Sequence, residues 1–141
     1  MFQGFTEQTF EFFMAIRFNN NREFFLENHD WYQSSVRTPC LDLAAALGES
    51  VNALDPELET RPTKVLSRIN RDVRFSNDKS PYRDHVWMAF RRPSVDRGGM
   101  PGLYFQLEAE GGEYGMGFYH ENREILDALR ARIAQRPDEM L

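Results

Sequence analysis

With 141 residues, of which 41% are hydrophobic and 13% aromatic, the chain is large enough to bury the core of one domain. No apolar run approaches the roughly 18 residues that a membrane helix needs, and the first residues lack the basic and apolar regions of a signal peptide. The single cysteine, Cys40, excludes an internal disulfide framework and a zinc finger. We therefore expect a cytoplasmic protein with no membrane contact.

The net charge of −5 is unevenly distributed. Residues 61–97 contain ten Arg and Lys against four Asp, a local balance of +6, whereas the remainder has a balance of −11. An acidic protein with one basic segment is poorly suited to non-specific binding of nucleic acid, so we expect no nucleic-acid partner. A small anion held at one site fits this distribution. Pairing of the basic segment with the protein's own acidic residues fits it equally well.

Residues 1–58 are predicted to be mainly helical. Thr6 is expected to cap a first helix, and Asn20, with an acidic residue three positions later, a second one. Thr38 followed by Pro39 fits the cap and first turn of a third helix, which ends near residue 55.

Residues 63–120 have strand patterning instead. Four strands are expected, at residues 64–75, 85–92, 103–109 and 113–119. Gly98-Gly99 is expected to turn the chain between the second and third strands. Leu103, Phe105 and Leu107 alternate with polar positions and should face the core. A final helix is predicted at residues 121–136, so the order of elements indicates one α+β domain, 1–141, built on an antiparallel sheet.

The most unusual segment is residues 68–85, where charges, apolar residues and a polar turn occupy 18 positions. If residues 68–75 are extended, Arg68 and Arg74 lie on a polar face and Arg71 on an apolar one. Arg68 and Arg74 are then candidates for contacting a ligand, whereas Arg71 is a candidate for internal pairing.

Our leading hypothesis is that this segment binds a small phosphate- or carboxylate-bearing ligand, because the planar arginine side chain captures such groups with paired hydrogen bonds. The expected ligand-binding residues are Arg68, Arg74, Ser76, Lys79, Tyr82 and Arg83. The end of the segment that carries Arg74 and Lys79 is expected to be the tighter part of the site, with Arg68 peripheral.

Two other hypotheses use the same residues. The arginines could form an internal network with Asp72, Asp78 and Glu23, in a structural or protein-interaction module. Alternatively, Asp72 or Asp78 could act as a general base in an enzyme whose arginines stabilise developing negative charge.

Sequence signatures of cofactor sites are absent. There is no glycine-rich phosphate loop and no dinucleotide fingerprint. His29, His85 and His120 lack the spacing that places metal ligands on one helical face. We therefore expect neither a metal nor another cofactor.

A protein partner or a second copy of the chain could bind the final helix. Its apolar residues Ile125, Leu126, Leu129 and Ile133 form one stripe that would need a covering surface. Arg91, Arg92 and Arg97, near the Gly98-Gly99 turn, could contribute to such an interface.

Several motifs together identify a family resemblance. They are Phe5-Thr6, residues 19–25, residues 68–82, His85, residues 101–104 and residues 115–117. With these motifs the chain resembles a bacterial and fungal family named domain of unknown function 2461. Two positions depart from the family pattern, which looks aromatic at Asn70 and looks like Trp at Phe24. The resemblance implies a fold but no activity, and it implies a longer chain, since family members continue past the final helix.

Overall fold

Three strands form an antiparallel sheet in the order β1–β2–β3, with β1 at His85–Phe90, β2 at Gly102–Glu108 and β3 at Gly111–Gly117. The computed structural model describes residues 1–93 and 99–139. The predicted α+β class is confirmed, and Leu103, Phe105 and Leu107 lie on the core side of β2, as predicted. Gly98, in the turn predicted at 98–99, lies outside the described residues.

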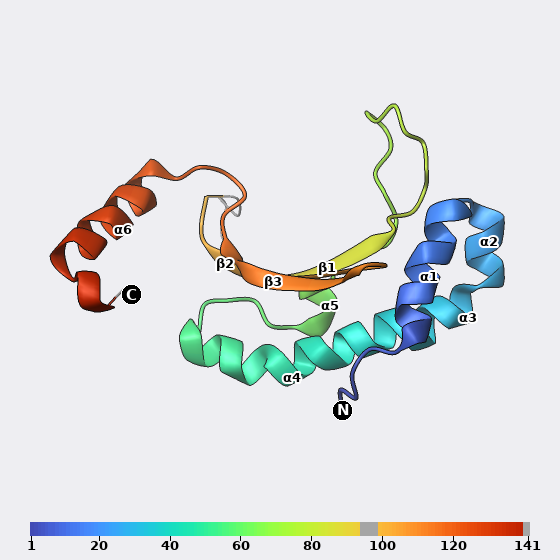
Figure 1. Cartoon of the computed structure of the whole chain (residues 1–141), viewed down its shortest axis with the longest axis horizontal. Coiled ribbons are helices and arrows are strands. Elements are labelled where there is room, and N and C mark those ends of the chain that lie inside the picture. Colours follow the sequence, from blue (N-terminus) through green and yellow to red (C-terminus); the bar gives the residue numbers. More distant parts are fainter. Residues whose placement is uncertain (94–98, 140–141) are drawn as a thin grey trace.

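Helices cover one face of this sheet (Figure 1). They are α1 (Glu7–Phe18), α2 (Arg22–Glu27), α3 (His29–Tyr32), α4 (Thr38–Leu54) and α5 (Pro62–Val65). The core lies between them and the sheet, because alternate β1 side chains point toward the helices. Val86 joins a buried cluster with Phe12 and Phe13, whereas Met88 and Phe90 join a second cluster under α4.

The first two helices begin near the predicted positions. Thr6 precedes α1 as expected, but α2 is capped by Asn21, whose side chain accepts a hydrogen bond from the Phe24 N–H at 2.8 Å. Asn20 has another role. Its side-chain amide donates to the Tyr82 carbonyl (2.8 Å) and accepts from the Tyr82 N–H (3.0 Å), as a neighbouring strand would. Asn20 therefore ties the turn between α1 and α2 to the chain just before β1.

Thr38 does not start a new helix, contrary to the sequence prediction. The chain is helical from α3 through a π-helical stretch, η1 (Gln33–Arg37), into α4. Pro39 lacks the N–H that would bond the Ser35 carbonyl, and its ring crowds that carbonyl. The buried hydroxyl of Thr9 donates to the Ser35 carbonyl instead, at 2.6 Å. A side chain of α1 thus donates to the carbonyl that Pro39 cannot bond, where the π-helical stretch carries the helix past the proline.

The strand predicted at residues 64–75 is wrong. Residues 62–65 form α5, Leu66 makes one bridge to Met88, and the chain then leaves the sheet. It returns as a projecting hairpin-like loop, residues 70–82, which we call the arm (Figure 1). Its two sides pair with each other at the base, where the Arg71 N–H donates to the Pro81 carbonyl at 2.9 Å. The predicted alternation holds for Ile69, which is buried, but Phe75 is 95% exposed because the arm has no core beneath it.

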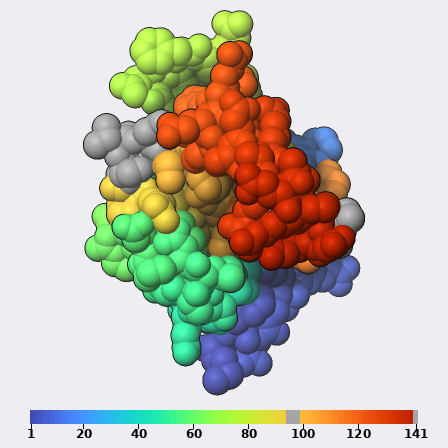
Figure 2. Space-filling model, turned by 90° about the vertical axis from the view of Figure 1, so that its left-hand side faces the viewer, coloured from blue at the N-terminus to red at the C-terminus, as the bar shows by residue number. Residues whose placement is uncertain are grey.

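The last long helix, α6 (Arg123–Gln135), agrees with the prediction for residues 121–136. The side chain of Asn122 caps it, accepting from the Ile125 N–H at 3.2 Å. No residue of α6 is buried, and the helix stands apart from the other elements in Figure 1. Figure 2 shows the same helix, in red, facing the viewer. Leu129 and Ile133 are each 42% exposed, whereas Ile125 and Leu126 are half-buried, so the second half of the predicted apolar stripe is uncovered.

We expect Thr9→Val to lower the free energy of unfolding by about 1–3 kcal/mol, because it removes the hydrogen bond from the buried Thr9 hydroxyl to the Ser35 carbonyl. The valine keeps the volume of threonine, so the loss reports the hydroxyl alone. Thr63→Val, at an exposed position, is the matched control and should change the stability little. Urea denaturation of both variants measures this. Equal small losses would mean that the Ser35 carbonyl finds another donor.

Candidate functional site

The face of the sheet opposite the helices is uncovered. Alternation places His85, Trp87 and Ala89 of β1 on this face, and the strand register sets them beside Tyr104 and Gln106 of β2. A hollow of about 620 Å³ lies over these residues, which we call the aromatic hollow. Phe118 and Tyr119, which follow β3, also line it. The arm rises on this same side of the sheet (Figure 1).

A second hollow of about 600 Å³ lies at the base of the arm, and we call it the basic groove. Its cationic lining residues are Lys64, Arg68, Arg71, Arg83 and Arg91. The lining carboxylate is that of Asp72, which already pairs with Arg74 at 2.6 Å. Trp87 and Arg91 line both hollows, so the basic groove and the aromatic hollow adjoin. The site is therefore positively charged at one end and aromatic at the other.

Arg83 holds the base of the arm. Its Nη1 donates to the Arg68 carbonyl at 2.7 Å and also to the Asn70 carbonyl, and its guanidinium lies 4.8 Å from the centre of the Trp87 ring. Desolvation, together with the positive charge of Arg71, lowers the pKa of Arg83 from its ordinary value. Among the described residues, Arg83 has no carboxylate partner. Its charge therefore adds to a positive potential that internal pairing leaves unneutralised.

Arg68 and Arg91 have no ion-pair partner within residues 1–93 and 99–139. Arg92 differs from them, because it pairs with Asp55 (2.9 Å) and Glu57 (2.9 Å). Arg97, named with these residues as a candidate interface cation, lies outside the described residues. Lys64 also has no ion-pair partner in the described part of the chain, so Lys64, Arg68 and Arg91 are cations of the groove that are available to an external anion.

The structure does not bring the six expected ligand-binding residues together. Arg68 and Arg83 line the basic groove, whereas Arg74, Ser76 and Lys79 lie in the outer part of the arm. Arg74 pairs with its neighbour Asp72, and the Lys79 ammonium donates to the Val73 carbonyl at 2.8 Å.

Tyr82 is buried and stacks on Phe25 of α2 with ring centres 4.3 Å apart. Sequence alternation could not show this, because it treats the segment as one strand rather than as the two sides of an arm.

The two carboxylates considered as general bases are paired within the arm. The hydroxyl and N–H of Ser80, followed by Arg71, lower the pKa of Asp78 to about 2. The hydrogen bond from Arg74 lowers the pKa of Asp72. A carboxylate with a depressed pKa is a weak base near neutral pH. These pairs also bear out the role assigned to Arg71, which bonds Asp78 at 2.6 Å and the Ser80 carbonyl at 3.1 Å.

Sequence reasoning missed a second polar group at the edge of the aromatic hollow. Asp84 accepts from Arg17 Nε at 2.7 Å and contacts His85 Nδ1 at 3.0 Å. Arg17 also donates to Glu110, with Nη2 3.0 Å from the carboxylate. The group joins α1, the start of β1 and the turn between β2 and β3. The one feature of the sequence that pointed to this group was Arg17, a charged residue at a position that continues the apolar spacing of the first helix.

Charge pairing controls the pKa values in this group. Burial opposes ionisation of Asp84, but hydrogen bonds from His85 and Arg17 outweigh it and lower the pKa of Asp84. The hydrogen bond from Arg17 lowers the pKa of Glu110 in the same way. The pKa of Arg17 is correspondingly raised.

Within the part of the chain that the structure describes, no group of three His, Cys, Asp or Glu side chains is arranged to bind a metal ion. None of the helices in that part is both long and apolar enough to span a membrane.

The fold and the site define a class: an α+β protein whose small antiparallel sheet has one face packed on helices and the other open beside a basic groove. The chain belongs to the DUF2461 family of conserved hypothetical proteins, whose model matches residues 8–141. Neither the comparison with curated proteins nor the comparison with solved structures gives a match.

Arg17→Ala is expected to destabilise the protein most at neutral pH. Asp84 and Glu110 have lowered pKa values in the folded state, so their contribution is complete above the ordinary carboxyl pKa of about 4 and is lost as the pH falls below it. The stability difference between wild type and variant should therefore be constant near neutral pH and shrink as the pH falls below about 5. Arg130→Ala, which removes an exposed pair with Asp127, is the control and should show little effect at any pH. A difference that stays constant with pH would assign the role of Arg17 to packing.

Proposed function

We propose that the protein binds a small anion, carrying a phosphate or carboxylate group, in the basic groove at the base of the arm. The observation that carries this proposal is the composition of the groove. Five cationic side chains line it, of which Arg71 is paired with Asp78, and the one carboxylate among the lining residues, Asp72, is already neutralised by Arg74. Four cations of the groove therefore lack a carboxylate partner in the described part of the chain. An anion would supply the missing negative charge.

Electrostatics favours this occupant. Like charges held close together repel, and the repulsion is stronger where the groups are partly removed from water. Desolvation is the main cause of the lowered pKa of Arg83, and the positive charge of Arg71 adds to it. A bound phosphate or carboxylate would relieve the repulsion and would accept hydrogen bonds from the unpaired guanidinium groups of Arg68 and Arg91.

The roles of the groove residues differ. Arg68 and Arg91 are proposed to contact the anion directly, whereas Arg83 shapes the groove by holding two backbone carbonyls and lying against Trp87. Arg74 and Lys79 are not proposed to contact the anion, because their side chains already donate hydrogen bonds to Asp72 and to the Val73 carbonyl within the arm. The proposal thus keeps the ligand class expected from the sequence but moves the site from the outer part of the arm to its base.

Titration calorimetry with inorganic phosphate, ribose 5-phosphate and citrate tests the proposal. We expect at least one of them to bind with a Kd of about 1 mM or tighter, and Arg68→Ala to weaken binding by about tenfold or more, since hydrogen bonds to charged groups contribute about 1.5–3 kcal/mol. Lys79→Ala is the matched control and should leave the affinity unchanged, because Lys79 lies outside the groove and bonds the Val73 carbonyl. Equal weakening by both variants would return the site to the outer part of the arm. Absence of binding by all three anions would favour the internal network of Arg71–Asp78 and Arg74–Asp72 pairs as the role of the segment.

Protein interaction through α6 is the second candidate function, because the helix exposes Leu129 and Ile133 and stands apart from the body of the protein (Figure 1). Charged residues flank this stripe, as at many partner-binding helices. Native mass spectrometry at several protein concentrations provides a test for self-association. If α6 mediates it, Leu129→Ser with Ile133→Ser should abolish the dimer without changing anion binding. A dimer that survives this double change would exclude the stripe as its interface.

An enzymatic role for Asp72 or Asp78 has less support, since both carboxylates are paired and have lowered pKa values. We propose a cytoplasmic location, on the basis of the single buried cysteine.

A further inference from the structure

Tyr104 forms a flat platform on the open face of the sheet. It lies on β2 directly opposite Gly115 of β3. A Cβ atom at Gly115 would come within 3.0 Å of Tyr104 Cε1, 3.1 Å of its hydroxyl oxygen and 3.2 Å of Cζ. The ring therefore lies across the neighbouring strand, in space that only glycine leaves open. One side of the ring packs on the backbone of β3, and the tyrosine remains 40% exposed.

The surroundings of this platform suit a planar ring. Trp87 lies diagonally across from Tyr104 on the same face, at a Cβ separation of about 7 Å for such pairs. Gln106, opposite Trp87, lines the same aromatic hollow. Within the described residues its amide has no hydrogen-bond partner, so it can donate to and accept from the edge of a ring. Stacking surface and edge recognition are thus present in one hollow of about 620 Å³.

Arg91 connects the hollow to the basic groove. Its side chain packs against Gly102, where a Cβ atom would lie only 2.6 Å from Arg91 Cγ. This close approach brings the arginine stem against the backbone of β2, and Arg91 lines both hollows. A ligand with a ring over Tyr104 could therefore place an anionic group at Arg91 and extend it toward Arg68.

We propose that the ligand of this site is an aromatic phosphate of the nucleoside phosphate class, with its ring stacked on Tyr104 and its phosphate at Arg91. The proposal rests on the anion-binding function proposed above and names the substrate class. Stacking on an aromatic side chain accepts any planar base, and arginine supplies the phosphate contact. The net charge of −5 favours a free nucleotide over a nucleic acid strand, which would meet repulsion outside the basic segment.

Adenosine 5′-monophosphate and ribose 5-phosphate are the probes for calorimetry, because they share the sugar phosphate and differ in the ring. We expect the nucleotide to bind about tenfold tighter than the sugar phosphate. Tyr104→Ala and Tyr104→Leu should both remove this difference and leave binding of ribose 5-phosphate unchanged. Tyr104→Phe should retain it. The leucine keeps an apolar side chain on the strand, so a misfolded alanine variant would not decide the outcome.

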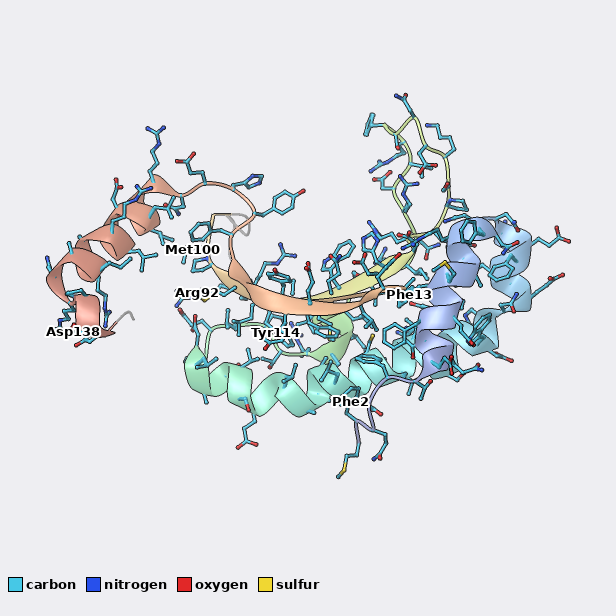
Figure 3. The ribbon with its side chains drawn as sticks, in the orientation of Figure 1. Phe2, Phe13, Arg92, Met100, Tyr114 and Asp138 are labelled. Carbon is cyan, nitrogen blue, oxygen red and sulfur yellow. The ribbon has the colours of Figure 1, made fainter. Side chains whose placement is uncertain are left out.

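Tyr114→Ala is the matched control. Tyr114 pairs with the core-facing Phe105, so it projects from the opposite face of the sheet, toward α4 (Figure 3). Its replacement should change neither affinity.

Three results would overturn the inference. Equal affinities for adenosine 5′-monophosphate and ribose 5-phosphate would overturn the nucleotide inference but leave the anion-binding proposal intact. If neither probe binds and inorganic phosphate does not bind either, the anion-binding proposal is overturned as well. A single-stranded oligoadenylate that binds more than tenfold tighter than the mononucleotide would assign the platform to nucleic acid.

Discussion

The site depends on the way Arg83 closes the base of the arm. The segment before β1 leaves the sheet after Ser67, and its backbone groups lose the partners that a fourth strand would provide. The Arg83 guanidinium bonds the Arg68 and Asn70 carbonyls, and the Asn20 amide pairs with the backbone of Tyr82. Side chains thus satisfy the backbone where strand pairing stops. The same guanidinium rests on Trp87, so the base of the arm and the open face of the sheet are built around one residue.

The ion pairs of the arm divide its positive charges into two groups. Asp78 neutralises Arg71, and Asp72 neutralises Arg74. Both pairs are at least partly exposed, so they shape the arm more than they stabilise the protein. They leave the inner cations without carboxylate partners in the described part of the chain. The positive charges are distributed evenly along the sequence of this segment, but the structure pairs only some of them. Arg71 and Arg74 are neutralised by carboxylates of the arm, whereas Arg68 and Arg83, beside the sheet, keep their positive charge unpaired within the described residues.

Elements that follow from local periodicity were predictable. The alternation of Leu103, Phe105 and Leu107 identified β2, and the cap at Thr6 located α1. The errors arose where contacts distant in sequence override local signals. Thr38-Pro39 has the pattern of a helix start, yet the hydroxyl of Thr9 from another helix lets the helix pass through the proline. Residues 68–75 alternate like a strand, but they pair with the other side of the arm. Charge drew attention to residues 68–85, and the structure places Arg68 and Arg83 of that segment in the basic groove. Arg91, Tyr104 and Gly115 become neighbours only through strand register, which a single sequence does not reveal.

The arm also has a consequence for the motions of the protein. Its outer residues bury little apolar surface, and Phe75 lies almost entirely in water. The arm is held mainly at its base, by the stacking of Tyr82 on Phe25 and by the bonds of Arg83. Such a segment can open as a cooperative unit at a lower free energy than global unfolding. Because the opening would separate the walls of the basic groove, an occupant of the groove would slow amide hydrogen exchange in the arm while leaving the exchange of the core helices unaffected.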